Sequence, residues 1–503
     1  MNAPKLDYAL LAPILIVLGG ALIGVLVEAF LSKTRRAGVQ LSIALITVAA
    51  AFVQIIRIRH SGSSGAAVLS VSIDAAGIFI QGTILILSLV ALLLIADADN
   101  FTAQASAIPG SSQESVAIQA GKQQTEIYPL TLFAIAGMLL FPVATDLVTL
   151  FVALEMLSLP LYLMAGLSRR RRLLSQEAAL KYFLLGAFSS AFFLMGSAFL
   201  YGYSGTLTLN GIASAIHTSG NNNVFLLIGI AFVSVGLLFK VGAVPFHNWT
   251  PDVYQGAPTP ITGFMAACTK AAAFGATLRI FYVALDGAQW SWKPVIAVIA
   301  VITMLFGAIA AWSQRDVKRM LAYSSIAHAG FILTAVVSLN AHALSASLFY
   351  FIAYGFATIG AFGIVTLVRD SSGEVGDINR WVGLGKKAPL TAATFVLFLL
   401  SFAGIPLTAG FIGKFSIFSA AYESGNIYLA VAGVLSSAIA VFFYLRIVIA
   451  LFFQDPENDS VSVVIPSGMT RIAISICALV TIILGLFPSL ILNAADTFAL
   501  FTR

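Results

Sequence analysis

Charged residues are scarce in this chain. Asp, Glu, Lys and Arg make up 10% of its 503 residues, whereas 59% are hydrophobic. A soluble globular domain carries about 25% charged residues, so this composition excludes an ordinary soluble fold. We predict an all-α polytopic membrane protein, because a helix satisfies its own backbone hydrogen bonds in lipid.

Cysteine is almost absent, and so are the common cofactor motifs. The two cysteines, Cys268 and Cys477, both lie in apolar stretches. Two thiols are too few for an iron–sulfur cluster held by four cysteines, and they give no disulfide framework. The sequence also shows no P-loop and no zinc-ligand spacing. The residues alone therefore indicate no iron–sulfur cluster, disulfide framework, P-loop nucleotide site or zinc site.

Apolar runs of about twenty residues recur along the whole sequence. A polar connection without apolar periodicity is expected at 97–126, and another at 454–460. The apolar runs predict fourteen membrane helices, near residues 8–30, 39–58, 73–96, 128–143, 145–167, 176–201, 223–249, 258–284, 293–312, 317–338, 344–369, 388–421, 426–453 and 470–492.

Lysine and arginine concentrate in the loops on one side of these helices, as in the run at 169–172. The positive-inside rule places those loops inside the cell, so an even number of helices puts both termini on the outer side. The net charge of +6 does not indicate nucleic acid as a partner, because the basic residues are spread over short loops.

Two helix breaks suggest an internal duplication. The stretch 242–245 (Gly-Ala-Val-Pro) closes the seventh predicted helix next to Lys240, and 404–406 (Gly-Ile-Pro) interrupts the twelfth before Lys414. Broken helices at corresponding positions are typical of transporters with repeats. Because five helices separate the breaks, the repeats are expected to be inverted.

The duplication divides the chain into four predicted regions. They are an N-terminal three-helix region with the polar loop at 1–127, a first repeat of helices four to eight at 128–284, a second, inverted repeat of helices nine to thirteen at 285–453, and a polar loop with the last helix at 454–503.

Four ionisable residues lie within apolar helices: Glu155, Lys240, Lys270 and Lys414. A charge at bilayer depth costs several kcal/mol unless it is paired or hydrated, so such residues usually mark an ion path. Two structural alternatives remain open. Glu155 and Lys240 form an ion pair that only fixes helix packing, or Lys270 and Lys414 extend to the membrane surface.

Four other ionisable residues are less distinctive. Arg279 and Arg446 lie nearer the ends of their helices, where extension of the side chain to the surface is expected. Lys181, about one turn into its helix, fits either a surface or a relay position. His328 suits a proton relay because histidine titrates near neutral pH, although a local hydrogen bond is the alternative.

Several stretches resemble one family of membrane proteins. Residues 245–260 read PFHNWTPDVYQGAPTP, and with Phe239 and Lys240 before them they are similar to the signature of the antiporter-like subunits of respiratory complex I. The form Pro-Asp-Val-Tyr-Gln-Gly resembles the N-type subunit in particular. Further similar stretches lie at 154–162, 179–183, 318–330 and 403–415.

The resemblance implies residue roles. The glutamate and lysine that pair in this family correspond to Glu155 and Lys240, and the next two family lysines correspond to Lys270 and Lys414. The sister M-type subunit carries a glutamate at the last of these positions, so Lys414 favours the N type. With Lys181 and His328, these four residues form the predicted proton relay.

The resemblance also implies a setting. It indicates a proton-translocating subunit of a bacterial NADH:quinone oxidoreductase in the cell membrane, without a redox cofactor of its own. NADH, FMN, iron–sulfur clusters and quinone are expected in partner subunits. The expected neighbours are the M-type subunit, small membrane subunits and the lipid bilayer.

Three alternative functions stay open. Subunits of multisubunit cation/proton antiporters share the broken helices and buried lysines. A relative of complex I driven by ferredoxin is a second alternative, and a purely structural membrane subunit is the third.

Overall fold

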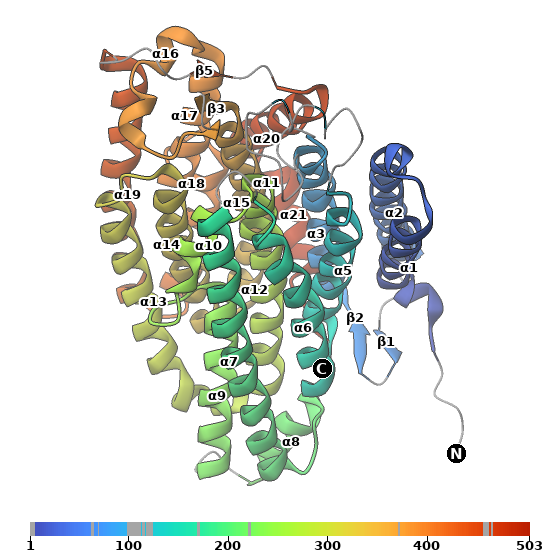
Figure 1. Ribbon diagram of the computed structural model, residues 1–503. Helices are drawn as coiled ribbons and strands as arrows, with labels where there is room; N and C mark the ends of the chain where they lie inside the picture. Colours follow the sequence, from blue (N-terminus) through green and yellow to red (C-terminus); the bar gives the residue numbers. More distant parts are fainter. Residues whose placement is uncertain are drawn as a thin grey trace.

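The computed structural model describes most of the chain (Figure 1). Its described residues are 6–61, 65–68, 70–97, 112, 116, 124–168, 172–219, 223–370, 373–455, 462–463 and 466–502. Most of the predicted polar connections at 97–126 and 454–460, and most of the basic run at 169–172, lie outside these residues.

The molecule is a bundle of long apolar helices, which confirms the predicted fold class. Among the described residues, twelve helical spans are long and apolar enough to cross a membrane. Ten are single helices: α1 (Tyr8–Phe30), α2 (Lys33–Ser61), α3 (Ala75–Ile95), α6 (Leu147–Ala165), α7 (Arg172–Ser204), α9 (Val224–Val241), α14 (Val317–Ser338), α15 (Ala341–Leu367), α19 (Ile427–Phe453) and α20 (Gly468–Leu486). An eleventh, Asp286–Trp312, consists of α13 (Gln289–Trp312) and the 3-10 turn before it.

The twelfth span is composite. One π-helical segment interrupts it and a second ends it, so that its parts are α11 (Thr259–Phe264), η3 (Met265–Thr269), α12 (Lys270–Arg279) and η4 (Ile280–Ala284). The helices α5 (Ile127–Leu140) and α17 (Pro389–Ala403) also lie at predicted positions but are shorter. The number of fourteen crossings therefore stays a prediction.

Short elements connect the spans. The helices are α8 (Leu209–Ser219), α10 (Trp249–Gly256), α16 (Leu384–Lys387), α18 (Ala409–Glu423) and α21 (Ser489–Phe498), with 3-10 turns η2 (Phe141–Val143), η5 (Asp286–Ala288) and η6 (Ile378–Trp381). The strands β1 (Gly65–Val68) and β2 (Val71–Ile73) form an antiparallel hairpin, and β3 (Val368–Asp370) pairs antiparallel with β4 (Gly373–Glu374) and β5 (Ser462–Val463).

Both predicted breaks are present. The helices α9 and α17 end at Gly242 and Gly404, which adopt left-handed φ angles of 75° and 80°. Glycine takes this conformation without the strain that a Cβ atom causes. The chain then continues into α10 after the first break and α18 after the second. Whether the two halves are inverted repeats stays a prediction.

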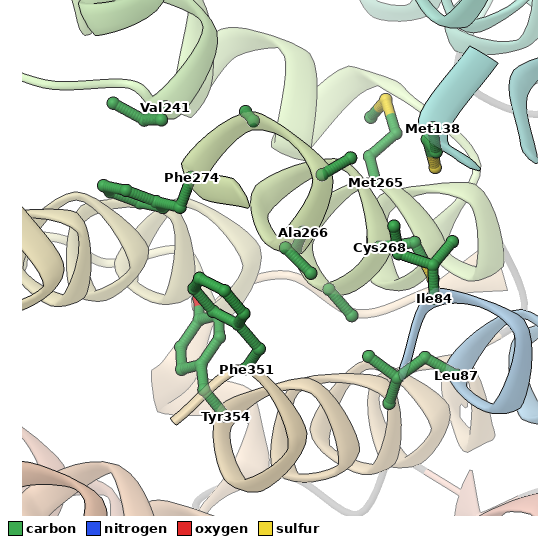
Figure 2. Packing of buried hydrophobic residues seen from close by; sticks show 14 of the residues in the cluster. Ile84, Leu87, Met138, Val241, Met265, Ala266, Cys268, Phe274, Phe351 and Tyr354 are labelled. Carbon is green, nitrogen blue, oxygen red and sulfur yellow. The ribbon is translucent and has the colours of Figure 1, made fainter. Parts of the chain in front are cut away.

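The centre of the bundle consists of the span Thr259–Ala284 together with α14 and α15. Nearly all residues of these three spans are buried, whereas α1 and α2 lie at one side of the bundle and α19 at the other (Figure 1). Figure 2 shows part of the apolar packing there, with Phe274 near Phe351 and Cys268 near Ile84 and Leu87. Polar side chains in this centre lie far from bulk water, so their few contacts define the site.

The expectation for Arg279 is wrong. Its side chain does not reach the surface but is 0% exposed, and its guanidinium donates two hydrogen bonds of 2.8 Å to the carboxylate of Asp74. Asp74 caps the N-terminus of α3 and also accepts a hydrogen bond from the backbone N–H of Thr502. A carboxylate inside the protein thus removes the reason to extend toward water. Arg446, in contrast, donates to carbonyls at the end of α13, Trp312 O and Gln314 O.

Candidate functional site

Lys240 lies in the last turn of α9 and is 4% exposed. Its Nζ donates a hydrogen bond of 2.7 Å to Ser158 Oγ of α6 and lies 3.5 Å from Tyr182 OH of α7. The rings of Tyr162 and Tyr182 are 5.9 and 5.5 Å from this nitrogen. The ammonium therefore has neutral partners, with two aromatic faces to stabilise its charge.

Glu155 lies one helical turn before Ser158 on α6. Its carboxylate forms no ion pair with Lys240 within 4.0 Å in the part of the chain that the structure describes, and its Oε1 atom is buried without a protein partner. The spacing of three residues places both side chains on the same face of α6. The structure thus brings Glu155 close to the Lys240 site without a direct contact.

Lys270 is the first residue of α12, directly after the π-helical segment η3. Its Nζ donates to the backbone carbonyl and the hydroxyl of Ser325 on α14, and it lies 5.3 Å from the ring of Tyr354 on α15. The side chain is buried and does not extend to the membrane surface. π-Helical segments are rare and occur frequently at functional sites, which agrees with a special role for this position.

A cavity connects Lys240 with Lys270. Both lysines line it, and polar groups of several segments complete its wall. The full lining is Tyr182, Lys240, Val241, Trp249, Thr250, Tyr254, Met265, Thr269 and Lys270. The two lysines therefore face one space although they belong to different helices.

His328 is buried on α14, one turn after Ser325. Its Nδ1 is hydrogen-bonded to Tyr350 OH, and its ring lies 4.9 Å from the ring of Tyr354. Ser325, which accepts a hydrogen bond from Lys270, and His328 are three residues apart and therefore lie on the same face of α14.

Lys414 lies on α18 and is 4% exposed. Its Nζ donates to Ala403 O at 3.1 Å and to Ser437 Oγ of α19 at 3.2 Å. The ring of Phe331 is 4.8 Å from the ammonium and also packs against His328, with ring centroids 5.4 Å apart. His328 and Lys414 therefore share an aromatic neighbour and have no hydrogen bond with each other among the described residues.

Lys181 lies apart from the other candidates. Its side chain is 42% exposed and forms ion pairs with Glu177 at 2.6 Å and with Asp252 at 2.7 Å. Asp252, on α10, also binds Arg319 at 2.6 Å. Burial alone raises the pKa of the Asp252 carboxyl, but the hydrogen bonds from Lys181 and Arg319 outweigh it and lower that pKa below its ordinary value. The structure thus places Lys181 in a charged cluster at the surface of α7 and α10.

Several neutral residues of the site escaped the sequence reasoning. Ser158, Ser325 and Ser437 each accept a hydrogen bond from one of the buried lysines, and Tyr350 binds His328. Serine and tyrosine are common in helices, so their identity alone is no signal. Ser158 and Ser325 do lie within the stretches at 154–162 and 318–330 that resemble the family. Their place in these stretches was the one feature that could have marked them as site residues.

The arrangement defines a class of protein. A line of buried lysines beside broken helices, in a membrane bundle, is typical of a transporter. Residues 144–440 match the family model described as NADH:quinone oxidoreductase/Mrp antiporter, TM. The chain belongs to this family.

Full-length relatives narrow the comparison. The chain is 54% identical to NADH-quinone oxidoreductase subunit N of Rhodococcus opacus, over 100% of this chain and 97% of that protein. It is 31% identical to a chain of respiratory complex I from Thermus thermophilus, with a TM-score of 0.79 and coverage of 96% of this chain and 99% of that one. The predicted resemblance to the N-type subunit is confirmed.

The fold alone does not separate the branches of the family. A chain of the Mrp complex from Dietzia sp. superimposes with a TM-score of 0.81 at 22% identity, covering 97% of this chain and 96% of that one. The similarity in sequence to N subunits is what distinguishes this chain.

Proposed function

We propose that this chain is the N-type, proton-translocating membrane subunit of a bacterial NADH:quinone oxidoreductase. The observation that carries the proposal is that Lys240, Lys270 and Lys414 are buried and that none of them has a carboxylate within 4.0 Å in the described part of the chain. An unpaired lysine inside a membrane protein costs several kcal/mol, so it persists where function requires it.

In the proposed path, protons pass from Lys240 through the shared cavity to Lys270, and then along α14 toward His328 and Lys414. Glu155 acts as the switch. When its carboxylate approaches the lysine it favours the charged form, and when it withdraws, burial favours the neutral amine and release of the proton. The separated arrangement of Glu155 and Lys240 supports the second state. Lys181 joins this path only through a rearrangement, because it is held at the surface by two carboxylates.

The energy for transport comes from neighbouring subunits under this proposal. NADH, FMN, the iron–sulfur clusters and quinone belong to those partners, and this subunit moves protons without a redox step. The proposed location is the bacterial cell membrane, with both termini on the outer side as the distribution of lysine and arginine indicates. The M-type subunit and small membrane subunits are the proposed neighbours.

A cation/proton antiporter subunit is the second candidate, because the family model and the fold include the Mrp antiporters. The two functions differ in what drives them. Vesicles that contain the chain and its native partners distinguish them: NADH-driven acidification supports the complex I function, whereas sodium-driven pH changes without any redox enzyme support the antiporter.

The decisive experiment replaces Lys270 with alanine in the whole complex. We expect Lys270→Ala to assemble and to lose most proton pumping in inverted membrane vesicles, measured with a pH-sensitive dye during NADH oxidation. Lys33→Ala, an exposed lysine at the start of α2, is the control and should pump normally. Normal pumping by an assembled Lys270→Ala complex contradicts the proposal.

A further inference from the structure

The imidazole of His328 has a single hydrogen-bond partner in the part of the chain that the structure describes. Its Nδ1 is bound to the hydroxyl of Tyr350 on α15, and its Nε2 makes no hydrogen bond to these residues. Both side chains are buried, with exposed fractions of 3% for the histidine and 1% for the tyrosine. A buried polar group depends strongly on each hydrogen bond that it makes, so Tyr350 has the main control over the direction in which this ring points.

Aromatic rings occupy other sides of the imidazole. The ring centroids of Phe331, Tyr354 and Phe402 lie 5.4, 4.9 and 5.6 Å from that of His328. These three rings come from α14, α15 and α17, and none of them is hydrogen-bonded to a nitrogen atom of the histidine. They pack against the imidazole without fixing where each nitrogen points, so the orientation of the ring is left to its bond with Tyr350.

Tyr350 is itself held in place by two neighbours. Its ring stacks on the ring of Tyr354, with centroids 6.1 Å apart and an interplanar angle of 11°. It also lies against Gly413, the residue before Lys414 on α18. A Cβ atom at Gly413 would lie only 2.7 Å from Cδ2 of Tyr350, so the close approach requires glycine at this position. Tyr350 thus contacts both the histidine of the proposed relay and the backbone beside its last lysine.

We propose that Tyr350 is a positioning residue that holds the imidazole of His328 in one orientation between Lys270 and Lys414, whether the ring is neutral or protonated. A hydroxyl can donate to the nitrogen of a neutral imidazole and accept from the N–H of a protonated one. The bond to Nδ1 therefore persists when His328 gains or loses a proton. The inference rests on the proposed function and deepens it, because it assigns a residue that acts through His328 and does not carry the proton itself.

The charged groups that face this site are the two lysines on either side of it. Lys270 is bound to Ser325, one turn before His328 on α14, and Lys414 lies 4.8 Å from the ring of Phe331, which packs against the histidine. The described residues place no carboxylate in an ion pair with the imidazole. A hydrogen bond to a charged group is stronger than one between neutral groups, so the tyrosine hydroxyl matters most to the protonated ring.

The test is Tyr350→Phe in the whole complex. Phenylalanine keeps the ring that packs against Gly413 and removes only the hydroxyl. We expect the complex to assemble and the NADH-driven pH change in inverted vesicles to slow by about three- to tenfold, as for one lost hydrogen bond. Tyr444→Phe is the matched control and should pump normally, because the buried hydroxyl of Tyr444 is bound to Ser324, which is also on α14 but lies outside the proposed relay.

The pH dependence separates positioning from packing. Because the protonated imidazole loses the stronger bond, the rate of Tyr350→Phe relative to the wild type should fall as the pH rises from about 6 to about 8, the range in which histidine titrates. A packing defect lowers the rate by the same factor throughout this range. Normal pumping, or a loss that is equal at every pH, overturns the inference.

Gly413→Ala tests the same contact from the side of α18. The added Cβ atom displaces the ring of Tyr350 while the hydroxyl and the imidazole are both kept. Pumping should slow with the same pH trend, and the double variant with Tyr350→Phe should be no slower than the slower single variant, because both changes remove one hydrogen bond. Losses that multiply in the double variant contradict the inference. If Tyr350→Phe does not assemble, the pH trend of Gly413→Ala decides.

A cryo-EM map of the whole complex shows the orientation of the ring directly. His328 should have one orientation in the wild type and in Tyr444→Phe, and a changed or divided one in Tyr350→Phe; an unchanged ring in Tyr350→Phe overturns the inference. Comparison with Lys270→Ala separates the two ideas. If Lys270→Ala abolishes pumping and Tyr350→Phe pumps normally, only the positioning role is rejected, whereas normal pumping by Lys270→Ala rejects the proposed function.

Discussion

The two helix breaks use the same backbone cap but treat their lysines differently. At the first break, the N–H of Ala243 donates to Leu238 O at 2.9 Å; at the second, the N–H of Ile405 donates to Leu400 O at 3.0 Å. Both contacts are the six-residue hydrogen bond that ends a helix before a left-handed glycine. The difference lies in the side chain that donates to a carbonyl of the last helical turn.

At the first break the side-chain donor is the indole of Trp249. Trp249 Nε1 donates to Phe239 O at 2.9 Å, which leaves Lys240 to bind a serine on another helix. At the second break the lysine itself donates to the helix end, since Lys414 Nζ binds Ala403 O. Lys240 also precedes its glycine, whereas Lys414 follows its own. Thus Lys240 donates to a side chain of another helix, whereas Lys414 donates to a backbone carbonyl at its own helix break.

This contrast predicts unequal consequences when the lysines are removed. Lys240→Met and Lys414→Met should both abolish pumping, but Lys414→Met also leaves Ala403 O without its donor, at a cost of about 1–3 kcal/mol for a buried acceptor. We expect a lower thermal unfolding temperature for Lys414→Met than for Lys240→Met in the purified complex. Equal unfolding temperatures would remove the distinction between the breaks.

Removal of the serine partners should have a smaller effect on pumping, and here the first break should be the more sensitive one. Ser158→Ala removes the nearer of the two hydrogen-bond partners of Lys240, whereas after Ser437→Ala the Lys414 ammonium keeps Ala403 O. Ser158→Ala should therefore reduce pumping more, by about three- to tenfold for one lost hydrogen bond, and Ser437→Ala less. The rate of pH change in inverted vesicles at equal NADH oxidation measures both. A larger loss in Ser437→Ala is incompatible with the contrast.

The smallest effect is expected from the indole at the first break. Trp249→Phe removes one of the two donors to Phe239 O and should destabilise the subunit by about 1 kcal/mol, measured by thermal unfolding. Trp292→Phe is the matched control. Trp292 Nε1 donates a hydrogen bond of 2.8 Å to Leu285 O, and neither residue belongs to a helix break. In Trp249→Phe alone, Phe239 O keeps only the hydrogen bond of 3.0 Å from the backbone N–H of Gly242. It can then accept a second hydrogen bond from the Lys240 ammonium, so pumping should also fall modestly. A pumping defect of equal size in Trp292→Phe argues for a general packing effect instead.

The sequence predicted the features that depend on local chemistry. Apolar length located the long helices, glycine and proline located both breaks, and the cost of burying charge singled out Lys240, Lys270 and Lys414. The sequence did not predict contacts between segments that are distant in the chain. Arg279 was expected at the surface because its partner, Asp74, lies 205 residues away in the chain. The hydrogen bond between Tyr350 and His328 likewise joins two helices and exists only in the folded bundle.

The cluster of Asp74, Arg279 and Thr502 has a consequence for biosynthesis. Its three members lie far apart in the chain: the cap of α3, the end of α12 and Thr502. During translation Asp74 leaves the ribosome first, Arg279 much later and Thr502 near the completion of these 503 residues. The buried carboxylate can thus receive its full set of donors only after residue 502 has been made, so this part of the bundle becomes complete later than the contacts among the earlier helices.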